Sequence, residues 1–152
     1  MLLKQGIPVQ HCQFHQLQTI TQCLTRKPKL APNKELRDIA LCLARTTQRG
    51  LTTALDLWYE AYGEWLKERD QTTKQFVHRR TRRAYFSLRR NLPHLFTYQD
   101  PELKDKGVQI PNTTNALDGR FGVWKTKLKA HRGCSRTLKT TMLCSFFSER
   151  TD

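Results

Sequence analysis

The stretch LTTALDLWYEAYGEWLKERD, residues 51–70, carries the clearest amphipathic pattern in the chain. Leucines and aromatic residues recur in it at three- and four-residue spacings, which is the period of an α-helix with one buried face. Along a second stripe of the same helix the acids recur every four residues, and these are Asp56, Glu60, Glu64 and Glu68. The segment predicts a long helix that packs its apolar stripe against neighbouring helices.

The segment that follows, residues 74–90, is strongly basic. It contains no acid, and its basic residues are Lys74, Arg79, Arg80, Arg82, Arg83, Arg89 and Arg90. Apolar residues at helical spacing, including Ala84 and Leu88, supply a buried side, and Pro93 is expected to end the helix. We interpret the acidic stripe of residues 51–70 as a solvated face or as partners for some of these arginines, rather than as a metal site.

Two shorter helices and one strand are predicted before residue 51. Apolar residues at positions 17, 20 and 24 indicate a helix that stops before Lys27-Pro28, because the residue ahead of a proline avoids the helical conformation. Asn33 is a good N-cap for a second helix, which ends near residues 46–50. Residues 6–12 alternate between apolar and polar, which indicates a short strand, although Pro8 confines it to an edge or a strand start.

The C-terminal end predicts two more helices after a polar turn or linker over residues 99–107. The first has apolar residues at positions 117, 121, 124 and 128, and Gly133 suits the residue just past its end. Ser135 can cap the last helix. The fold class expected from the whole pattern is mainly α, a helical bundle with one short N-terminal strand.

The composition favours a polyanionic partner. The 152 residues include 27 Lys and Arg against 13 Asp and Glu, a formal net charge of +14, which makes nucleic acid the first candidate. The longest apolar run, residues 39–44, is far shorter than the ~20 residues that span a bilayer, and residues 1–10 lack the apolar core of a signal peptide. We expect a cytoplasmic protein without membrane binding, and its five cysteines, an odd number without repeated spacing, are expected to be free thiols.

A second basic cluster lies between residues 119 and 140, where no acid occurs. Clusters of this kind suit contact with the phosphate backbone of DNA, which gives affinity without sequence specificity. The candidate DNA contacts in the two clusters are Arg79, Arg80, Arg82, Arg83, Arg89, Arg90, Arg120, Lys125, Lys127, Lys129 and Arg132.

Two further groups of residues are candidates for a site. Cys12 and His15 form a C-x2-H pair, but a structural zinc site needs four ligands, and only His131 and Cys134 could complete it. A buried Cys12 and a hydrogen-bonded His15 are the alternative. Asp118 lies in the first turn of a predicted helix, where a carboxylate interacts favourably with the helix dipole, and mid-helix Gly122 suggests a close approach on that side.

Several motifs in one order resemble the C-terminal part of bacterial mutator-like insertion-sequence transposases of the DDE type. The N-terminal motifs are IPVQHCQFHQ at residues 7–16 and LTRKPKL at residues 24–30. AYFSLRRNLPHLF at residues 84–96 resembles the helical insertion of the family, and IPNTTNALDG at residues 110–119 resembles its last catalytic helix. The resemblance spans nearly the whole chain.

The resemblance implies a ribonuclease-H-like domain in which two Asp on a sheet and one Glu on a helix hold two Mg²⁺ ions for attack on phosphate. Asp118 matches the third acid and Asn115 the asparagine one turn earlier, while Cys12 and His15 match a supporting signature. Residues 1–31 then correspond to the last strand and following helix of that core, residues 32–109 to the helical insertion, and residues 110–152 to the final catalytic helix and a C-terminal helix.

Two departures from the family pattern matter. The usual Glu is Asp at position 118, which shortens its reach, and the first acid in this sequence is Glu35, beyond the C-x2-H pair. We therefore expect Mg²⁺ only in a complete enzyme, and no strand cleavage or joining by this chain alone. Three hypotheses follow. The first is a truncated transposase that binds transposon-end DNA, and the second is a DNA-binding module that regulates an intact transposase by sharing its DNA or its oligomer interface. The third is a small zinc protein.

Overall fold

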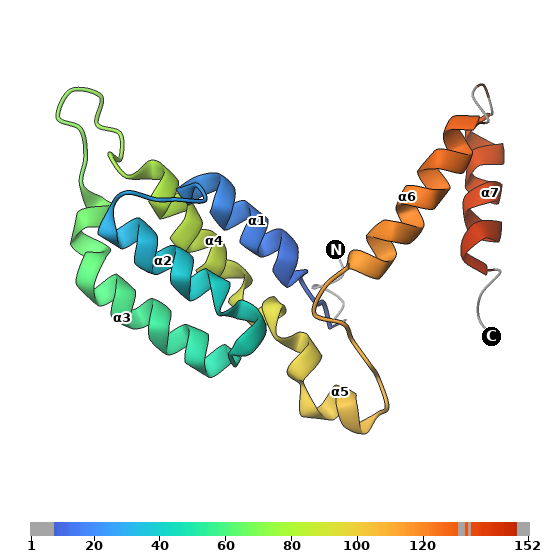
Figure 1. Ribbon diagram of the computed structural model, residues 1–152, viewed down its shortest axis with the longest axis horizontal. Coiled ribbons are helices and arrows are strands. Elements are labelled where there is room, and N and C mark those ends of the chain that lie inside the picture. The colour runs from blue at the N-terminus through green and yellow to red at the C-terminus, as the bar shows by residue number, and fades with distance from the viewer. Residues whose placement is uncertain (1–7, 131–132, 134, 149–152) are drawn as a thin grey trace. The chain divides into compact units, whose positions relative to one another are not determined.

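The computed structural model describes residues 8–130, 133 and 135–148, in two compact units, residues 1–113 and 114–152. In the described residues every regular element is a helix, so the mainly α prediction is confirmed (Figure 1). The α-helices are α1 (Gln13–Leu24), α2 (Ala31–Leu41), α3 (Gln48–Lys67), α4 (Arg79–Leu95), α5 (Pro101–Asp105), α6 (Asn115–Ala130) and α7 (Arg136–Ser148). Short 3₁₀ turns, η2 (Leu43–Arg45) and η3 (Thr97–Gln99), follow α2 and α4.

Helices α1 to α4 form a bundle around one apolar core (Figure 1). Helix α4 packs against both α1 and α3, and α2 packs against α1 and α3. Each helix contributes fully buried side chains, among them Ile20, Leu36, Leu55 and Leu88. Burial of such a side chain contributes about 1.5–3 kcal/mol, so this core is the main source of stability in the first unit.

Aromatic residues join three of the helices. The ring of Trp58 on α3 stacks on that of Tyr85 on α4, with centroids 5.3 Å apart, and Tyr59 stacks on the same tyrosine at 5.0 Å. The indole Nε1 of Trp58 donates a hydrogen bond to the carbonyl of Pro32 on α2 at 3.0 Å. The apolar stripe predicted for residues 51–70 therefore faces the core.

The predicted start of α2 is wrong by three residues. The helix begins at Ala31 with Leu30 as its N-cap, so Pro32 lies in the first turn, where its missing N–H needs no partner. Asn33 is not the N-cap. Its side-chain oxygen instead accepts a hydrogen bond from the Thr81 hydroxyl of α4 at 2.7 Å.

The predicted bounds of the basic helix are also wrong at both ends. Residues 70–78 form a tight connection instead of the first helical turn, because the Asp70 carboxylate accepts hydrogen bonds from the backbone of Thr73 at 2.6 Å and Thr72 at 3.0 Å. These bonds, that of Thr73 foremost, lower the pKa of Asp70. At the other end α4 continues through Pro93 to Leu95, because burial of Leu92 and Leu95 outweighs the one backbone hydrogen bond lost at the proline.

The strand predicted for residues 6–12 does not form over residues 8–12, and residues 6 and 7 lie outside the described residues. The segment lies instead along the C-terminal end of α4. The backbone N–H of His11 donates to the carbonyl of His94 at 2.7 Å, and the Thr97 hydroxyl donates to the carbonyl of Val9 at 2.9 Å. The His94 carbonyl and the Thr97 hydroxyl thus make the hydrogen bonds to this extended backbone that a partner strand would otherwise make.

The predicted linker over residues 99–107 contains the short helix α5. The Asp100 carboxylate caps it by accepting a hydrogen bond from the backbone of Glu102 at 2.9 Å, and Pro101 occupies the first helical position. This Asp-Pro pair combines the preferred N-cap with the preferred first residue of a helix.

The second unit consists of α6 and α7. Gly133, between them, has a φ of +97°, which suits glycine, and the Ser135 hydroxyl accepts a hydrogen bond from the backbone of Leu138 at 3.2 Å, as predicted. In the described part of this unit no side chain is buried, and Phe121, Val123 and Leu138 are 37%, 54% and 49% exposed. No helix in the described part of the chain is both long and apolar enough to cross a membrane.

Candidate nucleic-acid interface

The outward face of α4 is a row of arginines. Ala84, Tyr85, Leu88 and Leu92 turn toward the core, so helical geometry places most of the arginines between them on the opposite side. Five of the predicted DNA contacts are exposed there, namely Arg79, Arg80, Arg83, Arg89 and Arg90, and Arg82 is half-buried. The helix contains no acid, so its outer face is uniformly positive.

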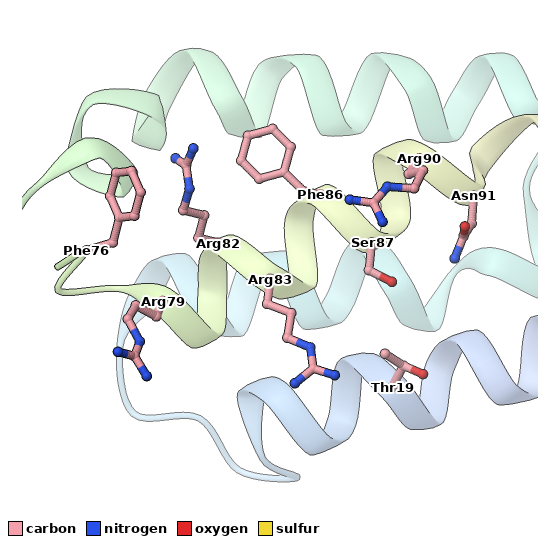
Figure 2. A pocket seen from close by; sticks show the side chains of 9 residues that line it. All are labelled: Thr19, Phe76, Arg79, Arg82, Arg83, Phe86, Ser87, Arg90 and Asn91. Carbon is pink, nitrogen blue, oxygen red and sulfur yellow. The ribbon is translucent and has the colours of Figure 1, made fainter.

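A hollow of about 550 Å³ follows this face of α4 (Figure 2). We call it the arginine groove. Its volume is within the range of roughly 300–1,000 Å³ typical of ligand sites, and no acid lines it. The lining residues are Thr19 of α1, Phe76 of the connection before α4, and Arg79, Arg82, Arg83, Phe86, Ser87, Arg90 and Asn91.

Arg82 differs from the other arginines of the groove because aromatic rings hold it. Its guanidinium carbon lies 4.0 Å from the ring centroid of Phe76 and 4.8 Å from that of Phe86. Figure 2 shows the guanidinium between the two rings, while the side chain of Arg83 extends toward α1. A second guanidinium, that of Arg69, lies 4.0 Å from the Phe76 centroid. Cation–π contacts of this kind restrict a long side chain to one position.

Neutral polar groups line the groove beside the arginines. The amide nitrogen of Gln16, a residue only 6% exposed, donates to the Ser87 hydroxyl oxygen at 3.1 Å. The Asn91 amide nitrogen donates to the side-chain oxygen of Gln16 at 2.8 Å. This network ties α1 to α4 and fixes the serine and asparagine at the groove wall.

The acidic stripe on α3 meets one of the α4 arginines. Arg89 forms an ion pair with Asp56 at 2.7 Å, so the predicted pairing is confirmed for this residue. Glu64 pairs with Lys67 at 2.5 Å, and Glu68 with His78 at 2.9 Å. Among the ion pairs of the described residues, none involves the four arginines of the groove.

Two arginines near the groove bond to neutral groups. A guanidinium nitrogen of Arg80 donates to the carbonyl of Gln22 on α1 at 2.9 Å, and Arg79 donates to the side-chain oxygen of Gln75. These bonds leave the positive charge uncompensated. The groove is therefore a concave, basic surface bordered by hydroxyl and amide groups, the combination that contacts phosphate oxygens in protein–DNA complexes.

Asp118 is in the first turn of α6, where it is exposed. Its carboxylate accepts a hydrogen bond from the Thr114 hydroxyl at 3.0 Å, and its backbone N–H donates to the carbonyl of Thr114 at 2.8 Å. This is the arrangement expected of a helix-start acid. The close approach predicted from Gly122 is not seen among the described residues, where no atom outside its own helical turn and chain neighbours lies within 4 Å of an added Cβ.

A two-metal site needs several carboxylates. Within the described residues, no three His, Cys, Asp or Glu side chains come together as metal ligands. Cys12 is half-buried and His15 is exposed. His131 and Cys134, the residues that could complete a zinc site with them, lie outside the described residues, as does Arg132.

The remaining predicted DNA contacts belong to the second unit. Lys125 and Lys129 are exposed on α6. For Asn115, Arg120 and Lys127 the structure describes the helical backbone but not the side chains.

Sequence reasoning missed the groove residues other than arginine. Phe86 follows Arg82 by four residues, the spacing at which side chains meet on a helix, so this contact could have been predicted. Phe76 lies before the helix and Thr19 on another one, so their positions depend on the tertiary fold. Comparison of the chain with models of protein families, with curated proteins and with solved structures found no match.

Proposed function

We propose that this chain is the C-terminal part of a mutator-like DDE transposase, and that its own contribution is to bind the phosphate backbone of DNA. The order of motifs in the sequence supports the family, and the net charge of +14 supports the class of ligand. In this proposal, the bundle of α1 to α4 includes the helical insertion of a ribonuclease-H-like transposase.

One observation carries the DNA-binding proposal. Four arginines line one hollow on α4, no acid lines it, and the ion pairs of the described residues leave these four out. Positive charges concentrated in a concave surface repel one another, and this repulsion destabilises the unbound protein. A phosphate backbone relieves that repulsion and releases condensed counterions.

The test is the salt dependence of binding to a labelled duplex, followed by fluorescence anisotropy. Each neutralised phosphate contributes roughly −0.9 to the slope of log affinity against log salt. Four groove arginines alone predict a slope steeper than roughly −3. Absence of binding at low salt, or an affinity that does not change with salt, would contradict the proposal.

The proposal assigns no catalysis to this chain alone, because Asp118 is a single carboxylate and a two-metal site needs several. We expect no nicking of supercoiled plasmid by the purified protein in the presence of Mg²⁺. The matched control is Asp118→Asn, which removes the charge and keeps the shape. Robust nicking by the wild-type protein that this substitution abolishes would contradict the assignment.

A second candidate function is regulation of an intact transposase by competition for its DNA or by formation of mixed oligomers. The observation that favours it is the buried core of the first unit, which lets the bundle fold without a sheet. Cooperative melting of a monomer that binds DNA would support this function, whereas an aggregating product would not. Unchanged fold and metal content after chelation would exclude the zinc protein.

A further inference from the structure

We infer that Arg82 is the preorganised phosphate contact of the arginine groove, and that the groove binds one strand of the backbone of duplex DNA without selecting bases. This inference rests on the proposed function and deepens it. It assigns separate roles to residues of equal charge: Arg82 contacts phosphate from a fixed position, while Phe76 and Phe86 are positioning residues that hold it.

The argument begins with the conformational freedom of arginine. A long side chain on a helix surface samples many rotamers, and binding a phosphate selects one of them at an entropic cost. Arg82 lies over Phe76 at 4.0 Å and over Phe86 at 4.8 Å, so much of this freedom is already lost in the unbound protein. Its guanidinium can still donate hydrogen bonds to a ligand, because contact with the π systems of the rings uses none of its N–H groups as hydrogen-bond donors to an oxygen acceptor.

The same contacts indicate what the groove does not bind. Sequence-tolerant binding of single strands depends on aromatic faces on which bases stack. Phe76 already has the guanidinium groups of Arg69 and Arg82 against its ring, and Phe86 has Arg82 and the edge-on ring of Tyr85. The aromatic residues of the groove are therefore committed to protein contacts, which favours binding of the sugar-phosphate backbone over binding of bases.

The neutral wall of the groove supports a phosphate ligand. The Ser87 oxygen accepts a hydrogen bond from Gln16, so its own hydroxyl hydrogen can be donated outward. The Asn91 amide uses one N–H toward Gln16 and has a second one to donate. Guanidinium, hydroxyl and amide groups along one hollow can donate hydrogen bonds to successive phosphate oxygens of one DNA strand. A duplex has a higher charge density than a single strand, which favours it as the ligand.

The decisive comparison is Arg82→Lys against Arg45→Lys, in the full chain, with labelled duplexes of two unrelated sequences. Both substitutions keep the charge, but Arg45 is exposed on η2 and has no place in the groove lining. We expect Arg82→Lys to weaken binding about tenfold for both sequences, because the preorganised planar donor is lost. Arg45→Lys should change affinity by less than about twofold, since it lies outside the groove and keeps the charge.

A second pair tests the positioning role of Phe86. Phe86→Leu removes the ring and keeps the charge, so we expect affinity to fall about fivefold with an unchanged salt slope. Phe86→Tyr keeps a π face and should bind like the wild type. A merely structural effect of Phe86→Leu would lower the melting temperature but leave the affinity per folded molecule, obtained by titration of active protein, unchanged, and that result would contradict the positioning role.

The outcomes separate the two levels of the proposal. If the wild-type chain binds no duplex, both the proposed function and this inference are overturned. If it binds duplex but Arg82→Lys and Arg45→Lys have equal effects, only the inference is overturned. Tighter binding of a single strand than of its duplex, or loss of affinity for only one of the two sequences, would also overturn it, because either result requires base contacts.

Discussion

The two units of this molecule carry similar basic clusters on very different supports. In the first unit, α1 to α4 bury a core that includes Ile20, Leu55 and Leu88, and this core fixes the arginines of α4 in a groove. In the second unit, the described side chains of α6 and α7 are exposed or half-buried, apolar ones included. The difference teaches that charge content alone does not make a binding site, because a site needs charges held at fixed positions.

The largest expected effect concerns the buried core of the first unit, compared with the exposed apolar residues of the second. Leu88→Ala, at a residue with no exposed surface, should lower the free energy of unfolding by about 2–5 kcal/mol, from lost burial plus the cavity left behind. Leu138→Ala on α7, where the leucine is 49% exposed, should change it by less than about 0.5 kcal/mol. Urea denaturation followed by circular dichroism measures both, and similar losses for the two variants would break the comparison.

A smaller effect on stability is expected from substitution of one tryptophan in each unit, Trp58 and Trp124. Trp58→Phe leaves the Pro32 carbonyl on α2 without its indole donor and should cost about 1–3 kcal/mol in unfolding free energy. The buried indole nitrogen of Trp124 has no hydrogen-bond partner among the described atoms. Trp124→Phe should therefore be neutral to within about 0.5 kcal/mol, or stabilising. A greater loss for Trp124→Phe in thermal melts would show that α6 is anchored as firmly as α3.

The ion pair between α3 and α4 should contribute less still. Arg89 and Asp56 are 41% and 54% exposed, so solvent screens their attraction. A double-mutant cycle with Arg89→Ala and Asp56→Ala should give a coupling free energy of about 0.2–1 kcal/mol. Because this arginine is already paired, Arg89→Ala should also weaken DNA binding less than Arg83→Ala. The reverse order of affinities would contradict the assignment of the groove.

The smallest expected effect is a pH dependence in the bundle. Burial, and secondarily the neighbouring His94, lowers the pKa of His11 below 6.5. The unfolded chain therefore binds a proton more readily, so the stabilising contribution is full above about pH 6.5 and is lost as the pH falls through the lowered value. The melting temperature should drop between about pH 7.5 and pH 5, and His11→Gln should reduce that drop. An unchanged drop would show that another group is responsible.

Local patterns predicted most of the fold. The three- and four-residue spacing of apolar residues located α1, α3, α6 and α7. In α1 and α3 the apolar face is buried in the core. The errors occurred where tertiary contacts override local preference. Pro93 stays within α4 because Leu92 and Leu95 are buried beside it, and residues 8–12 form no strand because α4 supplies the partners of their backbone.

The sequence predicted the charge of the candidate site but not its shape. The cluster of arginines in residues 74–90 indicated a basic helix, but Thr19 and Phe76, which also line the groove, belong to other elements. The position of Arg82 between two rings depends on the turn that Asp70 stabilises before α4, which no helical pattern indicates. The role of Asp118 stays a prediction from the family resemblance; the structure shows its helix-start contacts with Thr114.

The most direct test of the account compares two charge-removal variants by their salt slopes in duplex binding. One variant changes three groove arginines, Arg79, Arg83 and Arg90, to alanine, and the other changes Lys125, Lys129 and Arg136 of the second unit. The account predicts that the groove variant loses roughly 2.7 from the slope, about 0.9 for each phosphate contact, and the second variant clearly less. Equal losses, or an unaltered slope for the groove variant, would contradict the claim that a fixed groove on α4 binds DNA.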